Sequence, residues 1–198
     1  AYTYALPVEI RHVTPYANTS YFSMNGHTFG EYNLNTGATL WTKSLMPGMY
    51  ISNYSLNSNY IITREFDSVR IIDNKNGEQL HQFWIPDAYY VNTSYDAPVI
   101  NEDYAFALFQ DDKENDRAEL YAFDLRNRTI KWKLENQYYS HSYRDPLVLI
   151  NKTLFCMSKD LKKVNAINID TGKIEWSWYL PAGENNTYSP PEMLATAD

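Results

Sequence analysis

Short runs of alternating apolar and polar residues follow one another along the chain, and each run ends at Gly, Asn, Asp or Pro. Alternation with a period of two predicts strands that are buried on one face. No stretch keeps apolar residues at three- and four-residue spacing over three turns, as an amphipathic helix requires. The pattern therefore predicts an all-β protein.

One pattern of alternating residues, a polar turn and a ring-bearing residue recurs four times. The copies are YNLNTGATLW (32–41), IIDNKNGEQLH (71–81), YAFDLRNRTIKW (121–132) and AINIDTGKIEW (166–176). Their turn residues are 40, 51 and 44 residues apart, at Gly37, Gly77, Arg128 and Gly172. Strand-rich repeats of this period are typical of β-propellers.

Each copy resolves into four short strands separated by turn residues, which predicts four-stranded antiparallel blades. The first strand of the first blade is expected within 8–13. We expect one propeller domain over 1–198 with blades at about 8–45, 51–84, 97–135 and 145–180, while 187–198 begins a further blade or closes the ring. The incomplete last blade favours a piece of a larger ring of about seven or eight blades. A closed four-bladed ring and a ring built from two copies are the alternatives.

A second recurring element lies between the blades. It reads SYDAPVINEDY (94–104), SYRDPLVLINK (142–152) and TYSPPEMLATAD (187–198). We expect these Ser/Tyr/Asp/Pro segments to lie on an exposed face.

The copies at 32–41 and 166–176 resemble the repeat of the PQQ-like β-propellers. That family includes quinoprotein dehydrogenases, the outer-membrane assembly lipoprotein BamB and, more distantly, lumenal domains of stress-sensor kinases. The resemblance covers nearly the whole chain and implies propeller blades, but it does not select among family members.

The motif residues have separate expected roles. Glycine permits a positive φ at the tight turn between the third and fourth strands, at Gly37, Gly77 and Gly172. The resemblance implies that the motif tryptophans dock against the motif of the neighbouring blade; they are Trp41, Trp132 and Trp176. The second copy has His81 in place of tryptophan, followed by Phe83 and Trp84, and the third has Arg128 in place of glycine. These departures are expected to weaken docking in two blades.

The composition of the chain excludes some classes of function. The 198 residues carry 44% hydrophobic residues, 18 Tyr and a net charge of −7. Aromatic residues suit pleated surfaces, and the absence of a basic stripe excludes nucleic-acid binding. No apolar run is long enough for a transmembrane segment. The single cysteine, Cys156, forms no internal disulfide and is expected to be a small buried residue.

Six Asn-x-Ser/Thr sequons are candidate glycosylation sites, namely Asn18, Asn53, Asn92, Asn127, Asn151 and Asn185. Sequons have meaning in secreted or lumenal proteins, and the alternative is that turns are rich in asparagine. Both interpretations are compatible with export, so the predicted location is extracytoplasmic: the periplasm or envelope, the secreted fraction, or the ER lumen.

The sequence offers no convergent catalytic set. Most alcohol-oxidising quinoproteins have a vicinal Cys-Cys pair, which is absent here, and no quinone or ion ligands can be assigned. The acidic tract at Asp111, Asp112, Glu114 and Asp116 lacks the glycine of a tight calcium loop. The histidines have no zinc-site spacing; they are His12, His27, His81 and His141. A triad built on His141, Ser142 and Asp145 is disfavoured. The predicted sites are therefore structural, with no catalytic, cofactor or metal residue.

These observations predict a non-catalytic binding or scaffold propeller whose partner is a protein or peptide. One alternative is a fragment of a PQQ-dependent quinoprotein dehydrogenase with catalytic residues outside this chain. Another is the lumenal sensor domain of a stress-response kinase. The oligomeric state is left open.

Overall fold

All regular secondary structure in the described part of the chain is β-strand, as the residue alternation predicts. The structure is a computed structural model. It describes residues 10–16, 19–24, 28–44, 54–65, 67–86, 97–110, 118–138, 147–158 and 162–179. No stretch of these residues forms a helix with the length and apolarity needed to cross a membrane.

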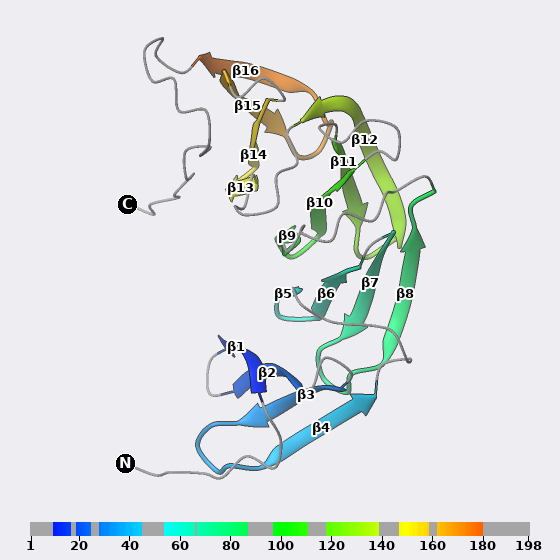
Figure 1. Cartoon of the computed structure of the whole chain (residues 1–198), viewed down its shortest axis with the longest axis vertical. Coiled ribbons are helices and arrows are strands. Elements are labelled where there is room, and N and C mark those ends of the chain that lie inside the picture. Colours follow the sequence, from blue (N-terminus) through cyan, green and yellow to red (C-terminus); the bar gives the residue numbers. More distant parts are fainter. Residues whose placement is uncertain are drawn as a thin grey trace. The chain divides into compact units, whose positions relative to one another are not determined.

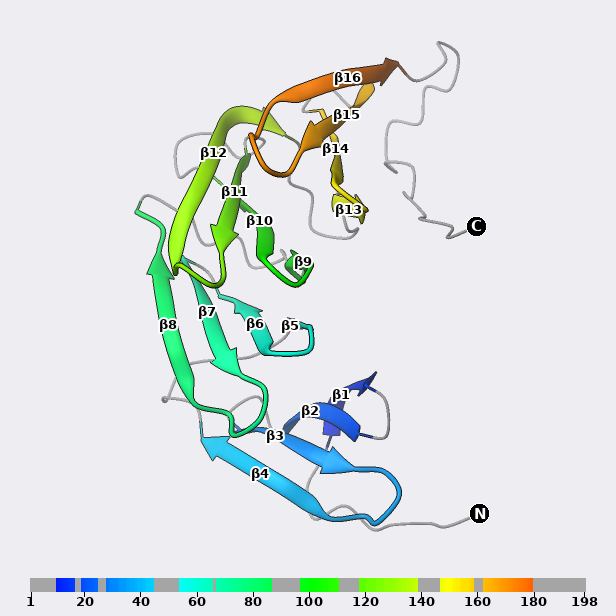
Figure 2. The same cartoon turned by 180° about the vertical axis from the view of Figure 1, so that it is seen from behind.

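The strands form four-stranded antiparallel sheets in which chain order is also spatial order (Figures 1 and 2). The first contains β1 (Ile10–Tyr16), β2 (Thr19–Met24), β3 (Thr28–Asn33) and β4 (Thr39–Ser44). The second contains β5 (Tyr54–Leu56), β6 (Tyr60–Arg64), β7 (Ser68–Asp73) and β8 (Gln79–Trp84). The third contains β9 (Val99–Ile100), β10 (Tyr104–Gln110), β11 (Ala118–Asp124) and β12 (Thr129–Tyr138). The fourth contains β13 (Leu147–Ile150), β14 (Thr153–Met157), β15 (Lys163–Asn168) and β16 (Ile174–Tyr179).

Strand β1 differs from expectation because it runs on to Tyr16 rather than ending near Val13. It passes through Pro15, which pairs with Ser20. Proline cannot donate to a strand ladder, so it is tolerated on an edge strand. Strand β1 is an edge of its sheet, which explains how a proline lies inside it.

The turn between the third and fourth strands is built by one acid or amide side chain. In the first sheet the Asn33 Oδ1 atom accepts hydrogen bonds from the backbone N–H groups of Asn35 and Thr36, at 2.9 and 3.1 Å. Asn168 accepts the equivalent bonds from Asp170 and Thr171 in the fourth sheet, at 3.0 and 3.1 Å. This side chain stabilises the turn locally, which explains why Asn or Asp recurs there.

A β-bulge follows the turn in the first, third and fourth sheets. Each bulge places one extra residue in the fourth strand, immediately before the motif tryptophan; the extra residues are Leu40, Lys131 and Glu175. A bulge bends its strand and re-aims the neighbouring side chain. We infer that the bulge sets the direction of the tryptophan.

The chain divides into two compact units, each with its own core. The first comprises Ala1–Glu65 and Val69–Gln82, and the second comprises Phe66–Ser68 and Phe83–Asp198. In the first unit, side chains of the first two sheets share one buried cluster, formed by Phe29, Tyr54, Ile61 and Ile72. In the second unit, the third and fourth sheets share a larger cluster that includes Phe106, Leu120, Leu147, Leu154 and Ile167.

One buried position in the third strand, three residues before the turn acid or amide, differs from sheet to sheet. In the second sheet it is Arg70, whose Nε lies 2.9 Å from a carboxylate oxygen of Glu65 and whose Nη1 donates to Gln79 at 2.7 Å. In the fourth sheet it is Asn165, which accepts a hydrogen bond from the Ser177 hydroxyl at 2.7 Å. Buried polar groups need such partners, and the second and fourth sheets provide them in different ways.

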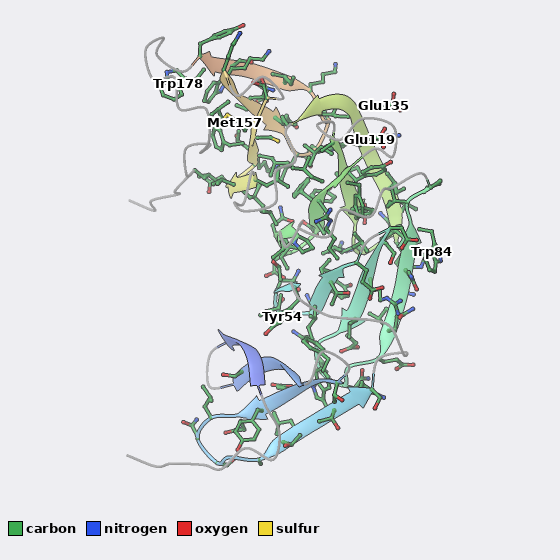
Figure 3. All side chains as sticks on the ribbon, in the orientation of Figure 1. Tyr54, Trp84, Glu119, Glu135, Met157 and Trp178 are labelled. Atoms are coloured by element: carbon green, nitrogen blue, oxygen red, sulfur yellow. The ribbon has the colours of Figure 1, made fainter. Side chains whose placement is uncertain are left out.

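The same position in the third sheet is Tyr121, which lies in a charged cluster. Its hydroxyl donates a hydrogen bond to Glu119 at 2.7 Å. The Nζ of Lys133 lies 2.9 Å from Glu119 and 3.1 Å from Glu135, and both glutamates are visible on this sheet in Figure 3. Burial, and next the hydrogen bond to Glu119, raise the pKa of Tyr121 to about 12.

We predict that alkaline pH unfolds the third sheet through Tyr121. Its folded-state pKa of about 12 exceeds the usual value of about 10. The stabilisation is therefore present below pH 10 and is lost as pH rises toward 12. Glu119→Gln should lower the pKa of Tyr121, because the carboxylate disfavours the phenolate. NMR titration of ring-labelled tyrosine, with Tyr121→Phe to assign the signal, measures the shift. An unchanged pKa in Glu119→Gln would contradict this account.

Candidate functional site

The repeat motif builds a contact between a tryptophan and the glycine turn of the following copy. In the first unit Trp41 on β4 lies over Gly77, where an added Cβ atom would come within 2.5 Å of the indole ring. In the second unit Trp132 on β12 lies over Gly172, where the corresponding distance is 2.9 Å. Both distances are too short for a side chain. These turns therefore accept the indole only because glycine has no Cβ atom.

The backbone conformation is a second reason why glycine occupies these positions. Gly37, Gly77 and Gly172 all have a φ of 71°. This is the left-handed region, which glycine enters without steric cost. Arg128 occupies the equivalent turn of the third copy with a φ of 57°, so the turn itself tolerates another residue at some strain.

Each docked tryptophan is anchored by its indole N–H and by an aromatic neighbour. The Trp132 N–H donates to the backbone carbonyl of Ile169, in the following copy, at 2.8 Å, and its ring lies 5.8 Å from that of Phe106. The Trp41 N–H instead donates to Glu31 on the neighbouring strand at 2.9 Å. The indole N–H thus donates either to the next copy, as in Trp132, or to a strand of its own sheet, as in Trp41.

In the fourth copy, no turn among the described residues covers the tryptophan. Trp176 packs against Phe155 with ring centroids 5.7 Å apart, as Trp132 packs against Phe106. Its side chain is nevertheless 52% exposed, and Trp178 two residues later is 55% exposed. Figure 3 shows Trp178 at the end of β16.

The second and third copies depart from the motif. The second copy has His81 at the tryptophan position, and the third has Arg128 at the glycine position. His81 is half-buried. Two residues later Phe83 is buried and packs against Phe123 with ring centroids 4.8 Å apart. Phe83 therefore supplies the aromatic packing in this copy, whereas Trp84 is exposed and projects from β8 (Figure 3).

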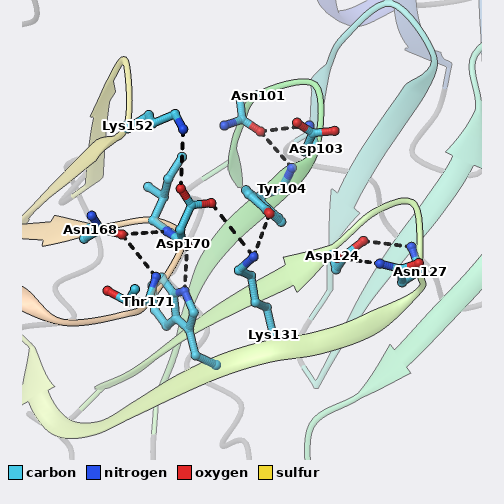
Figure 4. Close-up of polar contacts among 12 residues, drawn as sticks. Asn101, Asp103, Tyr104, Asp124, Asn127, Lys131, Lys152, Asn168, Asp170 and Thr171 are labelled. Carbon is cyan, nitrogen blue, oxygen red and sulfur yellow. Dashed lines mark hydrogen bonds and ion pairs between the residues drawn. The ribbon is translucent and has the colours of Figure 1, made fainter.

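A polar cluster joins the third and fourth sheets beside the Trp132 contact (Figure 4). The Nζ of Lys131 donates to the Tyr104 hydroxyl at 2.6 Å and lies 3.9 Å from an oxygen of Asp170. Lys152 approaches the other Asp170 oxygen at 3.6 Å. The hydrogen bond with Tyr104 is the main cause that raises the pKa of Lys131. The positive charge of Lys131 is therefore paired within the protein. The cluster also connects the turn at Asp170 to β12.

Within the described part of the chain, the remaining sequence candidates do not assemble into a site. Cys156 is fully buried, and burial raises the pKa of its thiol. His12 lies on β1, whereas His27, His141 and the acidic tract fall outside the described residues. Among the residues that are described, no three His, Cys, Asp or Glu side chains come together as metal ligands would.

Two of the six sequon asparagines are described, and both lie in exposed turns. Asn127 donates a side-chain hydrogen bond to Asp124 at 2.9 Å. Asn151 has a φ of 55° in the two-residue turn between β13 and β14. Asn18, Asn53, Asn92 and Asn185 lie outside the described residues.

Neither models of protein families nor curated protein sequences match this chain. Solved structures do match. BamB from Moraxella catarrhalis is 15% identical with a TM-score of 0.54, over 84% of this chain and 50% of that one. Quinohemoprotein alcohol dehydrogenase from Comamonas testosteroni is 11% identical with a TM-score of 0.66, over 87% and 35%. The computationally designed Ika8 protein is 15% identical with a TM-score of 0.61, over 86% and 49%.

The four antiparallel sheets and these likenesses define the chain as β-propeller blades. More narrowly, the fold is that of the PQQ-like, BamB-like propellers, as the repeat motif predicts. At these identities the likeness is one of fold. The chain spans about half the length of the BamB and Ika8 structures and 35% of the dehydrogenase.

We predict that Gly172 and Trp132 are energetically coupled. Gly172→Ala should destabilise the protein by about 1–3 kcal/mol through its positive φ and by more through the clash with the indole. In a Trp132→Ala background the clash disappears, so the same substitution should cost about 0.5–3 kcal/mol less. Urea unfolding of the four proteins of this double-mutant cycle measures the coupling. Additive effects would show that the indole does not require the glycine.

Proposed function

We propose that this chain is a non-catalytic binding or scaffold module of an exported protein, and that it recognises an extended protein segment. The observation that carries the proposal is the outer edge of the fourth sheet. Strand β16 ends that sheet, and five of its six residues are exposed. An edge strand presents unpaired backbone N–H and C=O groups, to which an extended peptide can add as a further strand.

The side chains of β16 suit such a partner. Trp178 and Tyr179 lie consecutively near its end and are 55% and 68% exposed, and they project from opposite faces of the sheet. Large aromatic side chains with a polar group are enriched at protein interfaces. A strand added along β16 would therefore meet an aromatic contact on each face.

Export and glycosylation are part of the same proposal. The exposure of the sequon residues Asn127 and Asn151 in turns supports glycan attachment there, because glycans need an accessible asparagine. The resemblance to a family that includes an outer-membrane assembly lipoprotein supports an extracytoplasmic location. The segments that we expected on an exposed face, 94–104, 142–152 and 187–198, are described only at 97–104 and 147–152. There Pro98 and Leu147 are buried, whereas the turn residues Glu102, Asp103, Asn151 and Lys152 are exposed.

A fragment of a quinoprotein dehydrogenase is the second candidate. The fold likeness to the quinohemoprotein alcohol dehydrogenase, with its TM-score of 0.66, favours it. The catalytic residues of such an enzyme would then lie outside this chain.

We predict that the wild-type chain selects peptides from a phage-displayed library of random dodecapeptides. The substitution Tyr179→Lys should weaken binding of the selected peptides by about tenfold or more. The reason is that edge lysines oppose strand addition and that the aromatic contact of Tyr179 is removed. Fluorescence anisotropy of labelled peptides measures the dissociation constants.

Ile150→Lys is the matched control. It places a lysine at an exposed apolar position on β13, the opposite edge of the same sheet, and should leave peptide binding unchanged. The proposal would be overturned if no peptide were selected while the chain, supplied with PQQ and calcium, oxidised alcohols with a dye acceptor.

A further inference from the structure

We propose that Asn76 is a site of spontaneous deamidation, and that the docking of Trp41 on Gly77 controls the rate of this modification. Asparagine is one of the chemically labile residues. Its side chain is attacked most readily when glycine follows, because glycine has no Cβ atom to obstruct the attacking nitrogen. The sequence contains two such dipeptides, Asn25–Gly26 and Asn76–Gly77, and the second lies in the described part of the chain. This inference is independent of peptide binding at β16.

The reaction needs only the two neighbouring residues and water. The backbone nitrogen of Gly77 attacks the Cγ atom of Asn76, so that an N–Cγ bond forms. The Cγ–Nδ2 bond breaks, and ammonia leaves with the proton of the Gly77 nitrogen. Water then opens the resulting cyclic imide. Opening at Cγ gives aspartate, whereas opening at the backbone carbonyl carbon gives isoaspartate, in which the main chain runs through Cβ and Cγ.

The turn between β7 and β8 places the two reacting groups next to each other at the surface. Asn76 is exposed, so water reaches its side chain. Its Oδ1 atom accepts a hydrogen bond from the backbone N–H of Glu78 at 2.8 Å. This bond spans the Gly77 nitrogen, and it therefore holds the Asn76 carboxamide beside the peptide bond that would attack it.

The folded turn nevertheless prevents the Gly77 nitrogen from attacking. The Gly77 N–H donates to the backbone carbonyl of Asp73 at 2.9 Å, and this bond retains the proton that must leave. Gly77 is also buried. An added Cβ atom there would come within 2.5 Å of the Trp41 ring and 2.9 Å of the Lys43 Cγ atom. Ring closure must move the Gly77 nitrogen, and these covering side chains oppose the movement. Deamidation therefore proceeds from the opened turn.

Deamidation in turn disturbs the contact that restrains it. Isoaspartate adds the Cβ methylene to the main chain immediately before Gly77, which shifts the glycine relative to its hydrogen-bond acceptor at Asp73. Aspartate instead adds a negative charge to a turn that already contains Asp73 and Glu78. Docking of Trp41 thus slows the modification, and the modification weakens the docking between the first two sheets.

Peptide mapping by mass spectrometry of the 198-residue chain, incubated at neutral pH, tests the proposal. We expect Asn76 to deamidate at least about tenfold more slowly in the folded chain than in a synthetic peptide of residues 71–80, because only the opened turn reacts. Trp41→Ala should raise the rate in the folded chain by about tenfold or more. Hydrogen exchange of the Gly77 amide should accelerate by the same factor, since both processes require the bond to Asp73 to open.

Trp132→Ala is the matched control, because it removes the docked indole of the other unit and should leave the rate at Asn76 unchanged. Rates are expressed relative to that of Asn25 in the same chain, which corrects for a general loss of structure, and circular dichroism verifies folding. Equal rates in the folded chain and the peptide, an unchanged relative rate in Trp41→Ala, or an equal rise in Trp132→Ala would each overturn the proposal.

Discussion

The contact between an indole ring and a glycine turn is the constraint on which the pairing of sheets depends. A flat ring approaches a backbone turn to within van der Waals distance only where no Cβ atom stands between them, as at Gly77 and Gly172. The same glycines hold a φ that other residues adopt with strain. Sterics and backbone conformation therefore select glycine together, and a change at one position disturbs both the turn and the packing of the next sheet.

Two local structural features place the indole ring over that turn. An asparagine or aspartate accepts backbone hydrogen bonds and fixes the turn, as Asn168 does. A β-bulge at Lys131 or Glu175 then adds one residue before the tryptophan and re-aims it. At Lys131 the extra residue is also used, because its side chain reaches Tyr104 and Asp170 and ties the two sheets together.

Alternation and turn residues were enough to predict the strands, because polar spacers interrupt every apolar run. The glycine turns were also visible, since Gly37, Gly77 and Gly172 recur in register. The bulges were not predictable, because the residues that form them, such as Glu175, share no type and only the cross-strand register reveals them. Burial of Phe83 instead of Trp84 was equally hidden, since both are aromatic neighbours and only the direction of the strand decides which one packs against Phe123.

The division of the chain into units follows the docked pairs. Copies one and two, joined by Trp41 and Gly77, contribute to one unit, while copies three and four, joined by Trp132 and Gly172, lie in the other. Each unit therefore contains one complete contact between an indole and a glycine turn, together with the buried cluster that its two sheets share. Because repeats are stabilised by their contacts with neighbouring repeats, the docked pair and the shared cluster act together to hold two copies as one compact unit.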